Sequence, residues 1–277
     1  MQGLSTIAHL LACPACRGGL GLTAENLTCA SCARIFPVVR GIPQLALFSD
    51  GSEDPPEAAG RSTGAYERRY QDLERARSYN LKYEREILKR LSTRREHRLL
   101  GRLLGRAGRS ATLLEIPCGG GRISAQLSGA ADILIHADIG LGQVLFAQSR
   151  AKPDIPRVWM TASALQIPLR DGAVDGAVCV RLSHHLASAD QRERLLMELL
   201  RVTRRYVIFT FFDHHAIKNR LRLLRGKKSK LTMTVPQVCA LAAAGGARLA
   251  ACSWISRLAS GHRYALLLKP EGGASGA

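Results

Sequence analysis

Acidic residues, aromatic residues and long apolar runs are all scarce in this sequence, and each shortage argues against a particular location or binding partner. No apolar stretch reaches the roughly 18 residues that a membrane-spanning helix needs. The first residues lack the charged start, the long apolar stretch and the small-residue cleavage site of a secretory signal. We therefore expect a soluble, cytoplasmic protein with no transmembrane segment. In that reducing compartment we expect its cysteines to form no disulfides.

The shortage of acid makes the chain strongly basic. Only 22 acidic residues oppose 40 lysines and arginines, which gives a formal net charge of +18. Such a surface attracts polyanions, for example nucleic acid, anionic lipid or phosphorylated substrates. The alternative is that the excess, which is mostly arginine, only solvates the surface. Aromatic residues make up 5% of the chain, which is little for a surface that binds single strands by stacking.

Composition divides the 277 residues into five segments. Residues 1–48 hold four of the eight cysteines, and residues 49–64 are rich in Gly, Pro, Ser and acid, which is typical of a flexible linker. Residues 65–106 repeat apolar side chains at steps of three and four, which predicts a helical cap of one or two amphipathic helices. We expect one large domain over 107–270 and a disordered tail over 271–277.

Within the large domain, short apolar runs alternate with helical stretches. The expected strands are 111–116, 132–137, 157–161, 174–180, 206–212, 248–254 and 264–268, and the expected helices begin or lie at 121–127, 141–150, 189–202 and 236–244. Repeated strand-then-helix units predict an α/β fold. The sheet is expected to be Rossmann-like, doubly wound, mostly parallel and seven-stranded, with an antiparallel element at the end and a small N-terminal zinc-ribbon in front.

Four cysteines form two C-x2-C knuckles: Cys13, Cys16, Cys29 and Cys32. Two knuckles can complete a tetrahedral site of four thiolates, which predicts structural zinc with no open position for catalysis. A segment of about 40 residues has too small a core to fold alone, so the zinc would stabilise it. We expect chelation to unfold residues 1–48 and to spare the large domain.

The other cysteines are scattered, and we expect buried small hydrophobic residues at Cys118, Cys179, Cys239 and Cys252.

A glycine-rich loop follows the first expected strand of the large domain. Residues 114–122 read Leu-Glu-Ile-Pro-Cys-Gly-Gly-Gly-Arg, and glycines allow a sharp turn and close approach of a ligand. The register is not that of a nicotinamide site, and no Lys-Ser/Thr pair follows as a phosphate loop requires. Asp138, seventeen residues beyond Gly121, ends the next strand, where a carboxylate can accept both hydroxyls of a ribose. The pattern indicates a nucleotide-like ligand.

With these residues, 111–210 resembles the class I S-adenosylmethionine-dependent methyltransferases, of the group that includes the ubiquinone and menaquinone methyltransferases. The resemblance implies that Glu115 faces the amino-acid end of the cofactor, that Asp138 binds the ribose and that Ile139 packs on the adenine. It also implies cofactor contacts from the loop and from the ends of the following strands: Pro117, Cys118, Gly119, Gly121, Ser163, Ala164 and Val180. Residues 163–175 and 201–204 match the family as well. The family often has Asp in place of Ser163, and a neutral hydroxyl should bind the adenine amino group more weakly.

Residues 29–45 carry a second resemblance, to the small zinc-ribbon activator of tRNA and protein methyltransferases. A ribbon fused ahead of a methyltransferase domain is also similar to the bacterial 23S rRNA guanine-N1 methyltransferases. Those commonly have a histidine in the second knuckle, where this chain has Cys32.

The methyl acceptor is the open question. After the fourth strand, His184 and His185 are candidate general bases; the alternative is that His185 packs under the cofactor and His184 caps the next helix. A run of Asp213, His214 and His215 follows the fifth strand, but adjacent histidines do not easily meet one metal ion.

A basic segment over 216–231 is a candidate lid at the substrate edge of the sheet, where it could bind phosphates or rest on an anionic membrane. Its lid residues are Lys218, Arg220, Arg222 and Arg225. The alternative is a solvated helix face.

Three functions remain in view. The first is methylation of a small-molecule, lipid or quinone-like acceptor. The second is methylation of rRNA or tRNA, with ribbon and lid holding phosphates. The third is a non-catalytic zinc-ribbon binding module.

Overall fold

The computed structural model describes residues 2–48, 71–85, 87–224, 226, 232–256 and 260–270. The linker expected at 49–64 and the tail expected at 271–277 lie outside these residues. In the described part of the chain, no helix is both long and apolar enough to cross a membrane.

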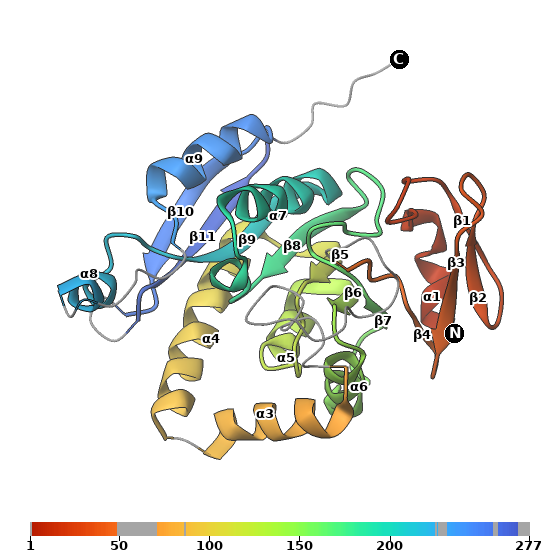
Figure 1. Cartoon of the computed structure of the whole chain (residues 1–277), viewed down its shortest axis with the longest axis horizontal. Coiled ribbons are helices and arrows are strands. Elements are labelled where there is room, and N and C mark those ends of the chain that lie inside the picture. Colours follow the sequence, from red (N-terminus) through yellow and green to blue (C-terminus); the bar gives the residue numbers. More distant parts are fainter. Residues whose placement is uncertain are drawn as a thin grey trace.

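A seven-stranded sheet forms the centre of the large domain (Figure 1). Its strands are β5 (Ser110–Glu115), β6 (Ala131–Asp138), β7 (Arg157–Thr161), β8 (Val174–Cys179), β9 (Thr203–Phe212), β10 (Arg248–Trp254) and β11 (His262–Leu268). Their spatial order is β10-β11-β9-β8-β5-β6-β7. All neighbours are parallel except that β11 runs antiparallel to both β9 and β10. The predicted doubly wound α/β sheet is confirmed.

Helices connect the strands and cover both faces of the sheet. They are α5 (Ser124–Leu127), η2 (Ser128–Ala130), α6 (Leu141–Arg150), η3 (Ser183–His185), α7 (Ala189–Val202), α8 (Ile217–Leu224) and α9 (Val235–Ala244). The helix α5 begins three residues later than the sequence predicted and has only four residues. The loop after β5 is longer than expected because Gly119 and Gly121 adopt left-handed backbone conformations, with φ values of +51° and +77°.

The predicted helical cap consists of two helices, α3 (Leu73–Arg85) and α4 (Ile87–Ala107). Figure 1 shows them meeting at a corner, with α4 running along one side of the sheet and α3 passing below α5 and α6. Residues 65–70 and 86 lie outside the described part of the chain. The apolar side of α4 is buried through Leu100, Leu103 and Leu104.

The N-terminal segment contains α1 (Gln2–Thr6), η1 (Ala8–Leu10) and a small antiparallel sheet of β1 (Leu20–Leu22), β2 (Asn26–Cys29), β3 (Ile35–Val39) and β4 (Ile42–Pro43). It lies against the β7 edge of the large sheet. The N–H of Leu45 donates to the carbonyl of Thr161 at 3.1 Å, and the N–H of Ala12 donates to Pro168 at 3.1 Å. Arg17 forms an ion pair with the buried Glu198 of α7 at 2.8 Å.

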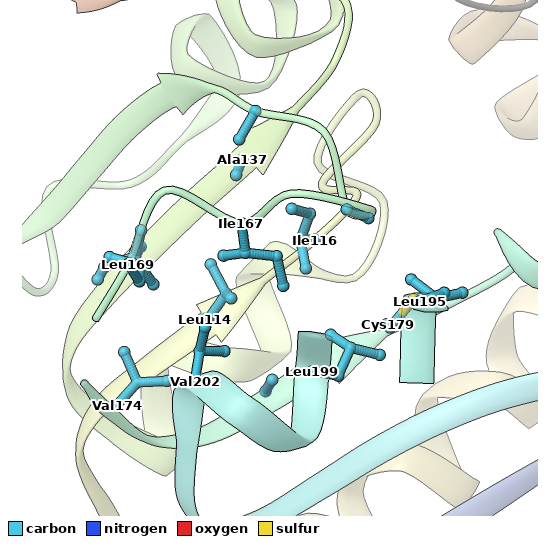
Figure 2. Packing of buried hydrophobic residues seen from close by; sticks show 14 of the residues in the cluster. Leu114, Ile116, Ala137, Ile167, Leu169, Val174, Cys179, Leu195, Leu199 and Val202 are labelled. Carbon is cyan, nitrogen blue, oxygen red and sulfur yellow. The ribbon is translucent and has the colours of Figure 1, made fainter. Parts of the chain in front are cut away.

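One hydrophobic core runs through both parts. Leu11, Phe36 and Leu45 of the N-terminal segment belong to the same buried cluster as Leu114 and Ile116 of the central strand. Figure 2 shows the centre of this cluster, where side chains of the sheet and of the connection between β7 and β8 meet the inner face of α7: Leu114, Ile116, Ala137, Ile167, Leu169, Val174, Cys179, Leu195, Leu199 and Val202. The N-terminal segment therefore shares its buried core with the large domain.

The four scattered cysteines differ from one another. Cys118 and Cys179 are buried as expected, Cys252 is half-buried and Cys239 is exposed. The expectation for Cys239 was wrong because α9 turns this residue outward, while Val238 and Ala242 of the same helix pack inward.

Candidate active site

The glycine loop after β5 lies at the carboxyl edge of the sheet. Gly119 has a φ of +51°, and the space that its Cβ would occupy holds no atom within 4 Å. Its N–H donates to Oδ2 of Asp138 at 2.9 Å. A loop that is open at this position leaves the backbone accessible to a ligand.

Asp138 ends β6 and points its carboxylate into the site. Besides the bond from Gly119, it accepts the N–H of Gly140 at 3.0 Å through Oδ1. Burial raises the pKa of Asp138 from 3.8 to about 6, although the two backbone N–H groups oppose the shift. Each carboxylate oxygen keeps a lone pair, so both can still accept hydroxyl hydrogens.

Two adjoining cavities meet at Asp138. The first has a volume of about 120 Å³, and the predicted residues that line it are Pro117, Cys118, Gly119, Asp138, Val180, His184 and His185. The second has a volume of about 50 Å³ and is almost entirely apolar; the predicted residues that line it are Pro117, Asp138, Ile139, Ser163, Ala164 and His185. A polar chamber beside an apolar slot suits a ligand with a charged end and a flat, apolar end.

Two predicted residues, Glu115 and Gly121, do not line either cavity. Glu115 is fully buried below the loop. Its Oε2 accepts bonds from Ser124 Oγ and His136 Nδ1, both at 2.6 Å, while its Oε1 is buried and has no hydrogen-bond donor among the described residues. Gly121 has a φ of +77°, and a Cβ there would touch Ala147 of α6. Gly121 therefore allows the loop to pack closely on that helix.

A chain of contacts continues from Glu115 through His136. Arg157 Nη1 lies 3.0 Å from Nε2 of His136. A guanidinium can only donate hydrogen bonds, so Nε2 of His136 accepts from Arg157. The ring proton is therefore on Nδ1, which donates a hydrogen bond to Glu115. The imidazole stacks on Trp159, with ring centroids 4.2 Å apart. This arrangement fixes Glu115 at the end of β5.

The cap supplies residues that the sequence did not single out. Asn80 of α3 lies on the glycine loop, where its side chain fills the space that a Cβ at Gly120 would need. Asn80 Nδ2 also donates to Gln143 Oε1 at 2.8 Å. Gln71, just before α3, accepts the N–H of Leu141 at 3.1 Å. The cap thus contacts the two loops that carry the residues predicted to bind the cofactor.

A second set of cap contacts centres on Glu96 of α4, which is fully buried. Its two carboxylate oxygens form ion pairs with Arg122 of the glycine loop and Arg181 of the segment after β8. Arg181 has a φ of +63°, and its N–H donates to Thr210 Oγ1 at 2.6 Å. Arg122 and Arg181 both line the larger cavity.

Three histidines lie together beside that cavity, and two of them, His184 and His185, line it. The ring of His184 lies 4.1 Å from that of His185 and 4.6 Å from that of His262 on β11. His262 was missed because it is nearly eighty residues away in sequence, and only the pairing of β11 with β9 brings it here. The alternative in which His184 caps the next helix is wrong, since the cap of α7 is Ser188, which accepts the N–H of Gln191.

In the run Asp213-His214-His215 after β9, the acid makes contacts within the fold. Asp213 is buried, accepts the N–H of His215 at 2.7 Å and pairs with Arg263. The rings of His214 and His215 stand at 90° to each other. Among the described residues, the four-cysteine cluster is the only group placed to hold a metal ion.

The candidate lid is described only in part. Lys218, Arg220 and Arg222 lie on α8, where Arg220 is exposed; the side chains of the other two, and all of Arg225, are outside the description. None of these residues lines the two cavities.

The four cysteine sulfurs fit a zinc ion. All lie within 4.8 Å of one another, with Cys13 and Cys32 Sγ 3.8 Å apart and Cys16 and Cys29 Sγ 3.4 Å apart. Zinc–sulfur bonds of about 2.3 Å in a tetrahedron require sulfurs about 3.8 Å apart. All four are free thiols without disulfides.

Comparisons with known proteins match two segments of the chain to families. Residues 114–211 match the family described as "Methyltransferase domain", and residues 6–41 match the family described as "Trm112p-like protein". No curated protein sequence matches the chain.

Solved structures share the fold. Magnesium protoporphyrin IX methyltransferase (ChlM) from Synechocystis PCC 6803 with bound SAM is 13% identical, with a TM-score of 0.58 over 78% of this chain and 100% of that chain. N-methyltransferase NodS from Bradyrhizobium japonicum WM9 in complex with S-adenosyl-l-homocysteine is 16% identical, with a TM-score of 0.56 over 73% and 98%.

The chain therefore carries a methyltransferase domain on the fold of the class I enzymes. By this domain and fold it is an S-adenosylmethionine-dependent methyltransferase, and its N-terminal segment is a Trm112p-like zinc-ribbon. These findings decide against a non-catalytic binding module.

Proposed function

We propose that this enzyme methylates a small-molecule, lipid or quinone-like acceptor, whose reacting group enters the larger cavity beside the charged end of the cofactor. The observation that carries the proposal is that the helical cap lines part of that cavity. Tyr79 and Asn80 of the cap line one side, and Arg181, His184 and His185 line the other. A chamber of about 120 Å³ that the helical cap lines in part suits a compact acceptor or acceptor headgroup placed against the cofactor.

The residues present fit the cofactor. The apolar slot between Ile139 and Ala164 suits an adenine ring, and Asp138 is placed to accept ribose hydroxyls. Asp138 lines both cavities, and its carboxylate favours a sulfonium cation bound nearby. When bound, S-adenosylmethionine supplies an activated methyl group.

The two histidines take different parts in this proposal. His184 lines only the larger cavity, so it is placed to remove a proton from the acceptor. His185 lines both cavities, so it contacts the cofactor as well and helps to orient it. The enzyme is proposed to work in the cytoplasm, where the zinc thiolates and free cysteines stay reduced.

RNA is the second candidate acceptor. It is favoured by the net charge of +18 and by the match of the ribbon to Trm112p-like protein. The basic lid would then hold phosphates, and binding would weaken steeply with salt.

Labelled S-adenosylmethionine added to a cell extract with the enzyme tests the choice. Label in the organic-extractable or small-molecule fraction supports the first acceptor class, while label that ribonuclease removes supports RNA. Absence of cofactor binding by calorimetry would contradict both. The Asp138→Ala variant is the control, because it should label nothing.

A further inference from the structure

Helix α8 carries an exposed apolar face. Ile217, Leu221 and Leu224 are 42%, 47% and 82% exposed, and they are three of the seven large hydrophobic residues with such exposure in the described part of the chain. At about 100° of rotation per residue, they fall within an arc of about 60°. Asn219 on the opposite side of the helix is fully buried. The apolar face is therefore turned outward and not toward the core.

The helix is anchored in this orientation. Asn219 Nδ2 donates to the carbonyl of His214 at 3.0 Å, and Ala216 is buried just before the helix begins. The N–H of Arg220 donates to the Ala216 carbonyl at 3.0 Å. These contacts hold α8 through its buried side and leave Leu221 and Leu224 at the surface.

The sequence of α8 and the residues that follow it is basic. Residues 216–231 contain seven lysines and arginines and no aspartate or glutamate. Arg220 is exposed beside the apolar arc, and Lys218 and Arg222 belong to the same helix. Apolar side chains flanked by cations are the pattern of a helix that lies in the interface of an anionic membrane.

The position of α8 relates this surface to the active site. Figure 1 shows α8 at the margin of the molecule, beyond the ends of β9 and β11. It begins five residues after Phe212, whose ring contacts His262 at 5.2 Å, and His262 in turn contacts His184. The exposed helix therefore lies on the same carboxyl edge of the sheet as the catalytic cavity.

We propose that α8 docks the enzyme on an anionic lipid surface, with Ile217, Leu221 and Leu224 inserted among the lipid chains. RNA phosphates would pair with the basic side chains of α8 but would leave Leu221 and Leu224 exposed to water. A second copy of this helix would bring like charges together. If the enzyme docks on a membrane, its methyl acceptor is expected to reside there, as an amphiphile with an apolar tail. This choice of acceptor rests on the proposed function, whereas the docking does not.

Vesicle co-sedimentation tests the docking on the full chain, without cofactor. We expect binding to vesicles of phosphatidylcholine with phosphatidylglycerol, and much weaker binding to phosphatidylcholine alone. Leu221→Ser with Leu224→Ser removes apolar area without a change in charge, and should lower the partition coefficient about tenfold or more. Arg220→Gln should lower it about fivefold.

Leu91→Ser is the matched control, because Leu91 is 49% exposed on α4, outside the proposed surface. It should bind vesicles as the parent protein does. Equal sedimentation of the double serine variant and the parent would overturn the proposal, as would binding to RNA but not to vesicles. Calorimetry with S-adenosylmethionine, run separately on each variant, tests the methyltransferase function and should give the same affinity in all of them.

Discussion

Glu96 of α4 accepts a hydrogen bond from Nε of Arg181 at 2.7 Å, across the boundary between the cap and the sheet. The same carboxylate pairs with Arg122 of the glycine loop. One fully buried acid thus joins the cap, the cofactor loop and the cavity wall. Since each arginine side chain is only 21% to 27% exposed, loss of the carboxylate would leave two partly buried cations without their partner.

We therefore expect Glu96→Gln to destabilise the protein by about 3 kcal/mol or more, because breaking a buried ion pair leaves an uncompensated charge. Urea unfolding measures the loss. The matched control is Glu74→Gln on α3, whose exposed pair with Arg77 spans 4.0 Å and should contribute less than about 0.5 kcal/mol. Equal stability of the two variants would contradict the role given to Glu96.

Gly120→Ala should disturb the contact between the cap and the loop. Its Cβ would lie 2.2 Å to 2.4 Å from the side-chain atoms of Asn80, so α3 or the loop must shift at a cost of about 1–3 kcal/mol. We expect weaker cofactor binding by calorimetry. Asn80→Ala in the same chain should restore much of it. Gly105→Ala on α4 is the control, because its Cβ would meet nothing within 4 Å; loss of affinity there too would point to a general effect of glycine replacement.

Much of the fold could be predicted from the sequence because each strand and helix has its own local pattern. The strand over 157–161 is found with the bounds expected, and the order of the sheet follows from repeated strand–helix units. Asp138 could be identified because it ends a strand at a fixed distance after the glycines. These are features of short stretches, which a single sequence carries.

Contacts between distant segments could not be predicted in this way. The periodicity of the cap predicts amphipathic helices but not that Asn80 covers Gly120 or that Glu96 reaches Arg181. His262 looks like an ordinary strand residue until β11 pairs with β9. The role of Glu115 toward the cofactor stays a prediction; the sequence did not indicate that its side chain is buried below the loop and lines neither cavity.

The shared core changes the expected effect of zinc removal. The sequence favoured a ribbon that unfolds alone, but Leu11, Phe36 and Leu45 pack in one cluster with Leu114 of the central strand. We now expect Cys16→Ser, or chelation, to lower the Tm of the whole chain in a single transition, because loss of the metal removes folding free energy from that core. Tryptophan fluorescence and zinc release should change together. Cys239→Ser, at an exposed cysteine outside the ribbon, is the control and should change neither. If chelation left the Tm of the large domain unchanged, the ribbon would be unfolding on its own, contrary to this prediction.

Replacement of the two histidines should separate proton removal from cofactor binding. His184→Gln should reduce kcat by about 10²- to 10⁴-fold, the usual contribution of a general base, and leave the cofactor Kd unchanged. His185→Gln should raise the cofactor Kd, because this residue lines both cavities. Turnover with an identified acceptor and calorimetry with the cofactor supply the two measurements. An acceptor without an acidic proton would be indicated if His184→Gln kept full turnover.

Asp138 should give the free protein and the cofactor complex opposite dependences on pH. Its pKa is raised from 3.8 to about 6, mainly by burial, so the folded state holds the proton more tightly than the unfolded chain does. Its stabilising contribution is therefore complete below about pH 4 and is lost as pH rises through about 6, by up to roughly 3 kcal/mol. Cofactor affinity should move the other way and fall about tenfold per pH unit below pH 6, as the carboxylate that accepts the ribose hydroxyls is protonated. Asp138→Asn removes both dependences, so the difference in Tm between the two proteins should shrink, or reverse, as pH rises. A constant difference in Tm and a flat affinity across this range would show that Asp138 does not titrate in the site.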